Sequence, residues 1–364
     1  MAGLSCGIVG LPNVGKSTLF NALTSNQAEA SNYPFCTIDP NIGIVDVYDP
    51  RLEVLSAISH SSKLIYASMK FVDIAGLVEG ASKGEGLGNQ FLTNIRDTDA
   101  IVHVVRCFES DDIIHVSGSV DPIRDIEVIN LELCLSDLQM IENAIGRMEK
   151  QLKTKKELMP TFECMKRARD HLNENKPMRT MVLNEEELLM LAPYQFLTIK
   201  KVLYAANVSE NELPTMDNAY VQAVTRYAEA EGNSVVPICA RIEEEIAQLP
   251  PNERGEFLET LGLEQSGLQR LIKKSFDMLG LITFLTTGEM ETRAWTITNH
   301  TTAAEAAGKI HTDIQKGFIR AEVVSYQDMV AYKGRNGARE MGKVRAEGRE
   351  YIVKDGDVIL FMHH

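Results

Sequence analysis

The chain has 364 residues, 44% of them hydrophobic and 24% charged, which is typical of a globular protein with room for two cores. No apolar run approaches the roughly eighteen residues that a membrane-spanning helix needs, and no basic or apolar targeting segment opens the chain. The six cysteines stand singly, without the pairing or histidine spacing of a zinc site. We therefore expect a cytoplasmic protein with reduced thiols and no membrane partner.

The formal net charge of −14 is unevenly distributed. Residues 281–364 carry eleven basic and eleven acidic side chains, so the first 280 residues hold 26 basic and 40 acidic ones. An acidic body excludes a general nucleic-acid binder, and we expect no DNA partner. The exception is a basic run near the C-terminus, which is either a contact with RNA or a solvated charged loop. Its basic members are Lys333, Arg335, Arg339, Lys343, Arg345 and Arg349.

The clearest motif lies close to the N-terminus. Residues 10–17 read Gly-Leu-Pro-Asn-Val-Gly-Lys-Ser, which fits the phosphate-loop pattern G-x-x-x-x-G-K-[ST]. The stretch Leu4–Val9 before it predicts a buried strand, and Thr18–Leu23 after it has helical spacing. In that setting backbone N–H groups surround a phosphate, Lys16 adds a positive charge and the Ser17 hydroxyl reaches Mg²⁺. The motif predicts a nucleoside triphosphate site.

Apolar segments then alternate with helical ones, as in a doubly wound α/β sheet. Between the fourth and fifth expected strands, Glu127–Lys156 and Thr161–Asn173 have apolar residues at helical spacing. We interpret residues of about 126–198 as a helical hairpin or coiled coil that docks a partner, inserted into a nucleotide-binding domain of residues 1–280. The expected strands are Leu4–Val9, Ile42–Val47, Lys70–Asp73, Ala100–Arg106, Val202–Ala206 and Ser234–Ile238.

Residues 281–364 follow a last helix at Glu264–Leu279 and have a different pattern. Strands and one helix within so few residues predict a small α+β domain of the β-grasp kind. The expected elements are strands at Ile282–Leu285 and Ala294–Ile297, a helix at Thr302–His311, and strands at Glu350–Val353 and Asp357–Phe361.

A nucleotide switch also needs groups that sense the γ-phosphate. Asp73-Ile-Ala-Gly76 follows a predicted strand, so Asp73 can hold Mg²⁺ through water while the Gly76 N–H bonds the γ-phosphate. Thr37 lies in the loop between the first helix and the second strand. Its hydroxyl can complete the Mg²⁺ shell when triphosphate is bound and leave after hydrolysis.

Leu77 follows Gly76, where Ras-like enzymes carry a glutamine that orients water. Because leucine cannot hydrogen-bond water, another group must position the nucleophile, or intrinsic turnover must be slow. Two candidates remain open. Asn13 can help hold a monovalent cation such as K⁺ beside the β- and γ-phosphates, and His115, in a polar segment after the fourth strand, can swing in to orient water.

The base side of the predicted site departs from guanine-specific switches, which carry Asn-Lys-x-Asp after the fifth strand. Here Asn207 is present, Val208 replaces the lysine and the longer Glu210 replaces the aspartate. Losing the bidentate carboxylate contact removes roughly 1–3 kcal/mol of guanine preference. Adenine can instead be read by the backbone near Val208 and the Asn207 amide, so we expect relaxed selectivity that favours ATP. A second base-side motif is expected after the sixth strand, at Cys239 and Ala240.

Together these features resemble the Obg family of P-loop proteins, and more narrowly its YchF, or Obg-like ATPase, branch. The resemblance implies a ribosome-associated ATPase that prefers ATP to GTP, with a coiled-coil insertion and a C-terminal TGS domain. It is carried by Gly10–Ser17, Asp73–Gly76, Leu77–Gln90, Asn207–Glu210 and, in the TGS-like part, residues 293–297, 307–313 and 346–357. It implies phosphate contacts from Asn13, Val14, Gly15, Lys16, Ser17 and Thr18, metal contacts from Ser17 and Thr37, and an adenine contact from the Val208 backbone.

The expected function is slow ATP hydrolysis whose nucleotide state changes the affinity for ribosomes or ribosomal RNA. One alternative is a GTP-preferring switch of the same family. Another is a nucleotide-gated binding module in which hydrolysis is incidental. A small-molecule kinase is disfavoured, because such kinases carry a mobile lid with arginines where this chain has the sensors Thr37 and Asp73–Gly76.

Overall fold

A computed structural model describes residues 4–25, 41–76 and 87–364. The chain divides into two compact units, one of residues 1–43 and 70–271, the other of residues 44–69 and 272–364. The expected division near residue 280 differs from this mainly in the segment 44–69. That segment lies within the expected nucleotide-binding domain, whereas its contacts join it to the C-terminal part of the chain.

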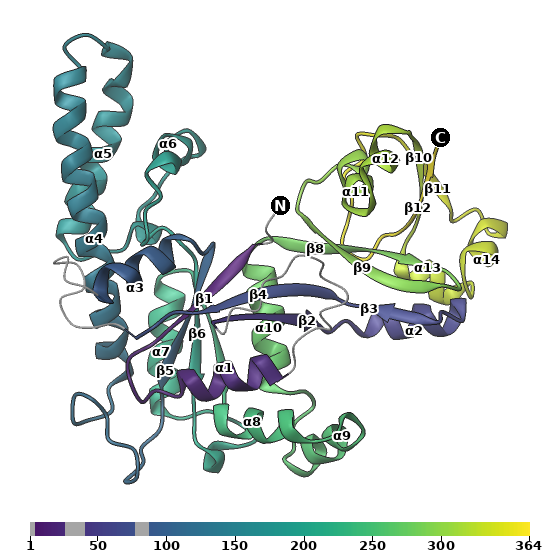
Figure 1. Cartoon of the computed structure of the whole chain (residues 1–364), viewed down its shortest axis with the longest axis horizontal. Coiled ribbons are helices and arrows are strands. Elements are labelled where there is room, and N and C mark those ends of the chain that lie inside the picture. Colours follow the sequence, from purple (N-terminus) through teal and green to yellow (C-terminus); the bar gives the residue numbers. More distant parts are fainter. Residues whose placement is uncertain (1–3, 26–40, 77–86) are drawn as a thin grey trace. The chain divides into compact units, whose positions relative to one another are not determined.

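The first sheet has six strands in the order β2-β4-β1-β5-β6-β7 (Figure 1). β1 is parallel to both of its neighbours, and β5, β6 and β7 continue in the same direction. All seven residues of β5 are buried, as expected for a central strand covered on both faces. The expected α/β architecture is therefore confirmed. The strands are β1 (Ser5–Val9), β2 (Ile42–Val47), β4 (Ala67–Asp73), β5 (Ala100–Arg106), β6 (Val202–Asn207) and β7 (Ser234–Ile238).

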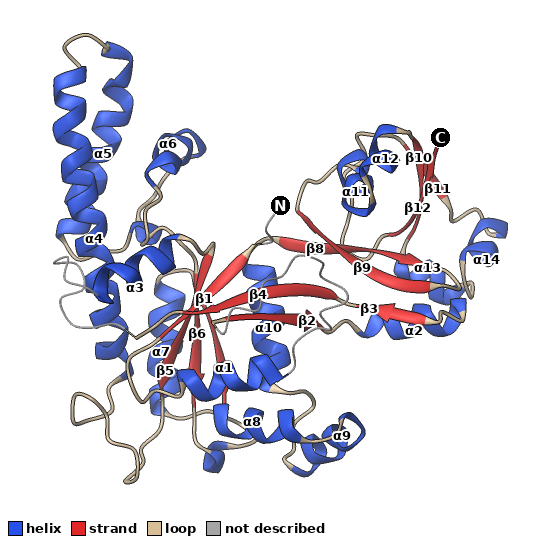
Figure 2. Ribbon diagram, viewed as in Figure 1, coloured by secondary structure: helices blue, strands red, loops and turns tan. Residues whose placement is uncertain are grey.

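Helices alternate with these strands (Figure 2). α1 packs against α8, and α4 packs against α7. Because the paired strands are parallel, their carboxyl ends share one edge of the sheet, where ligands bind in sheets of this class. The helices are α1 (Lys16–Ser25), α3 (Leu87–Arg96), α4 (Pro122–Gln151), α7 (Ala219–Ala230), α8 (Ala240–Gln248), α9 (Pro251–Thr260) and α10 (Gly267–Met278). None of the described helices is both long and apolar enough to span a membrane.

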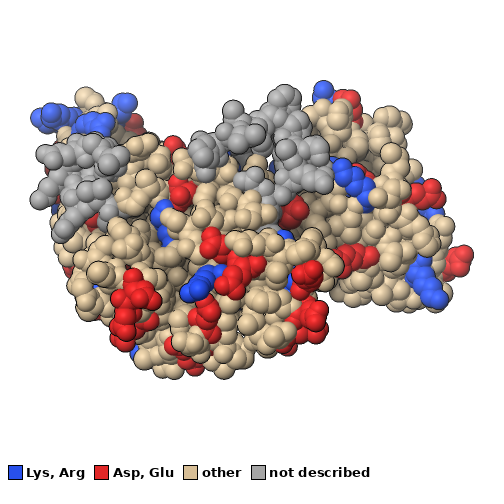
Figure 3. All heavy atoms as spheres, turned by 60° about the horizontal axis from the view of Figure 1, so that its bottom comes forward, with Lys and Arg blue, Asp and Glu red and all other residues tan. Residues whose placement is uncertain are grey.

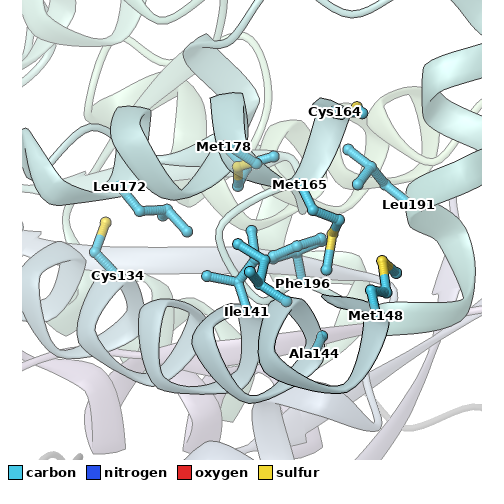
Figure 4. Packing of buried hydrophobic residues seen from close by; sticks show 12 residues of the cluster. Cys134, Ile141, Ala144, Met148, Cys164, Met165, Leu172, Met178, Leu191 and Phe196 are labelled. Atoms are coloured by element: carbon cyan, nitrogen blue, oxygen red, sulfur yellow. The ribbon is translucent and has the colours of Figure 1, made fainter. Parts of the chain in front are cut away.

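Residues 107–201, all of which the structure describes, contain helices and turns but no strand, as the sequence predicts. α4 and α5 (Met159–Asn173) form a hairpin, which α6 (Glu185–Leu191) follows (Figure 1). With 30 residues, α4 is about 45 Å long. A buried apolar cluster, most of which is labelled in Figure 4, fills the space between the two helices. Its α4 and α5 members are Cys134, Ile141, Ala144, Ile145, Met148, Cys164, Met165, Ala168 and Leu172.

Buried polar groups fasten the base of the hairpin. The Asp137 carboxylate of α4 accepts hydrogen bonds from the Leu197 N–H at 2.9 Å, the Thr198 N–H at 2.8 Å and the Thr198 hydroxyl at 2.7 Å. Burial raises the pKa of Asp137, while these three donors act in the opposite direction. Arg179 forms a buried ion pair with Glu231 of the sheet domain at 3.5 Å. The insertion is thus held to the sheet by satisfied polar contacts as well as by apolar packing.

The second sheet has the order β11-β10-β12-β8-β9-β3. β8 and β12 are parallel neighbours, and α11 (Ala303–Ile310) packs its alanines into the core on one face, as expected for a β-grasp domain. α2 (Pro50–Ser59) contacts β8 and β9. The strands are β3 (Lys63–Ile65), β8 (Leu281–Thr287), β9 (Glu291–Thr298), β10 (Phe318–Val324), β11 (Arg345–Glu347) and β12 (Val358–His363). Short helices α12 (Thr312–Lys316), α13 (Tyr326–Ala331) and α14 (Arg335–Glu340) complete the unit.

Several details of this unit differ from the expected elements, which did not include β10, β11 or the short helices α12, α13 and α14. The strand expected at Glu350–Val353 is wrong, because Ile352 makes only a single bridge, to Thr302, in place of a ladder. The unexpected strand β3 adds to the edge of the sheet by pairing parallel to β9, with Leu64 opposite Thr292. This three-residue strand forms because it pairs with β9, more than 200 residues away. It is too short for an alternation of apolar and polar residues to be recognised in the sequence.

Candidate functional site

The phosphate loop lies between the end of β1 and the start of α1. Asn13 and Gly15 have left-handed φ angles of 63° and 95°, which turn the chain around the site. A Cβ atom on Gly15 would lie 2.2 Å from the Asn207 Nδ2, so that only glycine fits this position. The free N–H groups at the start of α1 therefore open into the loop, where they favour an anion.

Asp73, one of the predicted metal-side residues, lies beside the phosphate loop. β1 and β4 lie side by side with Ile8 opposite Asp73, which brings the end of β4 next to the loop. The Lys16 ammonium forms an ion pair with the Asp73 carboxylate. Gly76 is exposed, with open space where a side chain would begin. Thr37 lies outside the described residues.

A pocket of about 760 Å³ extends from the phosphate loop along the ends of β5, β6 and β7. This volume lies within the range of small-molecule sites. The pocket joins four stretches of chain: the loop with the start of α1, residues 108–113, residues 207–211 and the start of α8. Predicted residues that line it are Asn13, Gly15, Lys16, Ser17, Thr18, Asn207, Val208, Glu210, Cys239 and Ala240.

Asn207, at the end of β6, links the two ends of this pocket. Its amide Nδ2 donates to the Val14 carbonyl at 2.9 Å, and its Oδ1 accepts from the Ala240 N–H at 3.0 Å. The side chain is buried. From the sequence this amide is expected to contact adenine, but both of its polar atoms already bond to the protein. Its visible role is to hold the phosphate loop against the start of α8.

Two contacts set the chemistry of the base side. The Val208 N–H donates to the Ile238 carbonyl at 2.9 Å, so a hydrogen bond from this backbone unit to a base must use the Val208 carbonyl, an acceptor. The Glu210 carboxylate pairs with the Arg241 Nε at 2.8 Å. Arg241 was not anticipated, although a basic residue directly after the Cys239–Ala240 motif is the signal that could have found it.

His115 lies apart from the groups that line the pocket. Its Nδ1 accepts from the Ser117 N–H at 3.0 Å, so its Nε2 carries the proton and donates to the Asp125 carboxylate at 2.7 Å. The ring is 4% exposed. Burial raises the pKa of Asp125, and the bond to His115 opposes that shift. To orient water at the γ-phosphate, His115 would have to leave both partners.

The segment around His115 nevertheless contacts the phosphate loop. The Asn13 Nδ2 donates to the Ile114 carbonyl at 3.2 Å, which leaves the Asn13 amide oxygen for other partners. Phe108, which sequence reasoning missed, lines the pocket, with the Arg106 guanidinium 4.7 Å from its ring centre. An aromatic residue just after a strand end was the available signal.

Comparison with known proteins is consistent across the whole chain. A family model described as "50S ribosome-binding GTPase" matches residues 5–142, and a model of the YchF GTPase C-terminal domain, described as a protein of unknown function, matches residues 281–364. "Ribosome-binding ATPase YchF" of Escherichia coli O157:H7 is 53% identical, with 99% of each chain covered. The Bacillus subtilis protein of that name is 52% identical, with 98% of each chain covered.

Solved structures agree with these matches. The structure of the Schizosaccharomyces pombe YchF GTPase covers 99% of this chain and 97% of its own, with a TM-score of 0.88 and 36% identity. A GTP binding protein from Pyrococcus horikoshii has a TM-score of 0.62 at 20% identity, covering 99% of this chain and 100% of its own. At that identity the second likeness concerns the fold alone.

Proposed function

Because the chain belongs to the YchF family, we propose that it is a ribosome-binding ATPase that hydrolyses ATP in the pocket described above. The phosphate loop supplies the triphosphate end of the site, with Lys16 as its positive charge. The nucleotide state changes the affinity for ribosomes.

The observation that carries the choice of ATP is the pairing at the base side. The Val208 carbonyl can accept from the N6 amino group of adenine, whereas guanine presents an acceptor oxygen at that position. The Glu210 carboxylate is partly neutralised by Arg241, which weakens it as a bidentate acceptor for guanine. Both contacts favour adenine.

The experiment that tests this choice measures affinity and turnover for ATP and GTP side by side at one Mg²⁺ concentration. We expect tighter binding and faster turnover with ATP, and slow turnover without ribosomes. Micromolar GTP binding without ATP binding would reverse the assignment to a GTP-preferring switch.

Mg²⁺ is the proposed metal cofactor. The exposed Ser17 hydroxyl and the partly exposed Asp73 carboxylate are hard oxygen donors at one end of the pocket, which suits this ion. Thr37 is a further proposed ligand from the sequence. Bound there with nucleotide, Mg²⁺ neutralises charge on the β- and γ-phosphates. Asp73 currently pairs with Lys16, so the same carboxylate serves either the ammonium or the metal's water shell.

Two further proposals concern how water is activated. The amide oxygen of Asn13 can bind K⁺ beside the phosphates, and equal turnover in K⁺ and Na⁺ would exclude that role. His115 can orient water only after release from Asp125 and Ser117. Unchanged turnover of His115→Ala would remove His115 from the mechanism.

The proposed partner is the ribosome, and a ribosome-binding protein of this kind acts in the cytoplasm. Co-sedimentation with ribosomes, with and without a non-hydrolysable ATP analogue, tests whether binding depends on nucleotide. Equal sedimentation in both states would contradict the proposed switch. Ribosome-dependent function that survives a hydrolysis-dead Lys16 variant would favour the binding module in which hydrolysis is incidental.

A further inference from the structure

The tip of the α4–α5 hairpin concentrates positive charge on an otherwise acidic chain. Four of the seven residues from Lys150 to Lys156 are lysines, and all four side chains are exposed. Within the part of the chain that the structure describes, none of them forms an ion pair. Their charge therefore faces solvent. The four lysines, called the tip lysines below, are Lys150, Lys153, Lys155 and Lys156.

The basic run near the C-terminus is different. Arg335 donates to the carbonyls of Glu322 at 3.0 Å and Val358 at 3.2 Å, and burial lowers its pKa. Arg339 pairs with the Glu322 carboxylate at 2.9 Å. Arg345 pairs similarly, with acidic neighbours in its own unit. These three arginines stabilise the β-grasp domain through internal contacts, so fewer unpaired positive charges face a partner than the sequence indicates.

The hairpin presents the tip lysines on a stiff support. Met148, only two residues before Lys150, is 5% exposed, and Cys164 on the facing helix is 3% exposed. The packed core in Figure 4 thus continues almost to the tip. Figure 3 shows a group of basic side chains at the upper left of that view. Little backbone freedom is lost when such a rigid tip meets a partner.

We propose that the tip lysines bind the phosphate backbone of ribosomal RNA. This inference rests on the proposed ribosome binding and names the surface and the chemistry of that contact. Lysine is a point charge that pairs with phosphates irrespective of sequence. Because the rest of the chain is acidic, a single basic tip also orients the approach to RNA.

An acidic protein is the less suitable partner for this tip. Cores of protein interfaces are depleted in lysine and need buried apolar or aromatic anchors. Met159, at 47% exposed, is the large apolar side chain that the tip exposes. Phosphates, by contrast, require charge without an apolar anchor.

The test changes all four tip lysines to glutamine in the full chain and measures binding to purified ribosomes and to protein-free ribosomal RNA over a range of salt. We expect binding to both to weaken at least about tenfold at low salt, and the slope of log affinity against log salt to fall by about 3. The same four changes to arginine should keep binding. A matched control removes four exposed lysines of the C-terminal unit, Lys309, Lys316, Lys333 and Lys343, with little expected effect.

Turnover of ATP without ribosomes should be equal in all variants, which shows that they fold. Wild-type affinity and salt slope in the tip variant, with a loss in the control variant, would overturn the proposal in favour of the C-terminal run. A tip variant that loses ribosomes but keeps protein-free RNA would make an acidic protein the partner. If the wild type binds no ribosomes, the proposed function fails, and the protein-free RNA measurement still decides the role of the tip.

Discussion

The two ends of the nucleotide pocket are built in different ways. The phosphate end consists of consecutive residues whose backbone N–H groups we propose as the phosphate donors, so it is a local motif. The base end depends on contacts between β6, β7 and α8, such as the pair of Glu210 with Arg241. Affinity for triphosphate can therefore be inferred from one short segment, whereas selectivity between purines depends on which distant side chains meet.

Asn207 joins the two ends through its bonds to Val14 and Ala240. A change at one end should consequently reach the other through this amide. The variants below distinguish changes that weaken ATP and GTP binding equally from changes that alter the preference between ATP and GTP.

The largest effect is expected at the phosphate end. In the proposed mechanism Lys16 stabilises the charge that develops on the transferred phosphoryl group, and Lys16→Ala removes this positive charge. We expect turnover of ATP and of GTP to fall on the order of 100- to 1000-fold, by analogy with the loss of one preorganised donor. Single-turnover hydrolysis measures this. A loss for one nucleotide only would mean that Lys16 belongs to the base end as well.

Gly15→Ala should destabilise the fold and weaken the binding of both ATP and GTP. The φ angle of 95° strains any other residue, and the new Cβ would overlap the Asn207 amide. We expect a loss of about 2–4 kcal/mol in the free energy of unfolding, measured by urea denaturation. Gly255→Ala in α9, where a Cβ meets open space, is the control and should be neutral or slightly stabilising. Equal behaviour of the two variants would contradict the steric argument.

Asn207→Ala leaves the Val14 carbonyl and the Ala240 N–H without their buried partner. We expect a loss of about 1–3 kcal/mol in the free energy of unfolding. The affinities for ATP and for GTP should fall by the same factor. Calorimetric titration of both nucleotides is the measurement. A loss confined to ATP would instead show that the amide reads adenine directly, as the sequence analysis assumes.

The smallest effect is expected at the mouth of the base end. Arg241→Ala frees the Glu210 carboxylate to accept from the N1–H and amino group of guanine. We expect the ratio of GTP to ATP affinity to rise about three- to tenfold, with little change in stability because the pair is exposed. In the double variant Arg241→Ala with Glu210→Gln, the gain for GTP should disappear. An unchanged ratio in both variants would exclude this pair from base selection.

The sequence predicted what local patterns determine. The strands of the first sheet, the phosphate loop and the helical insertion were evident from the periodicity and spacing of apolar residues. Contacts between distant residues were not evident. The burial of His115 against Asp125, the bonds of the Asn207 amide and the use of Arg335 inside its own domain all depend on which elements pack together. A polar residue in a loop has no periodicity that would show whether it is buried against a partner or exposed to solvent.

The origin of α2 and β3 has a consequence for biosynthesis. Residues 63–65 of β3 emerge from a translating ribosome more than 220 residues before their partner strand β9. At roughly 5–20 residues per second, that interval is roughly 10–45 s. During this time β3 and the apolar face of α2 have no partner strands, because β8 and β9 have not yet been synthesised. Residues 281–364 hold their own apolar core, so the late-made part can pack first and then receive β3 and α2 at its edge.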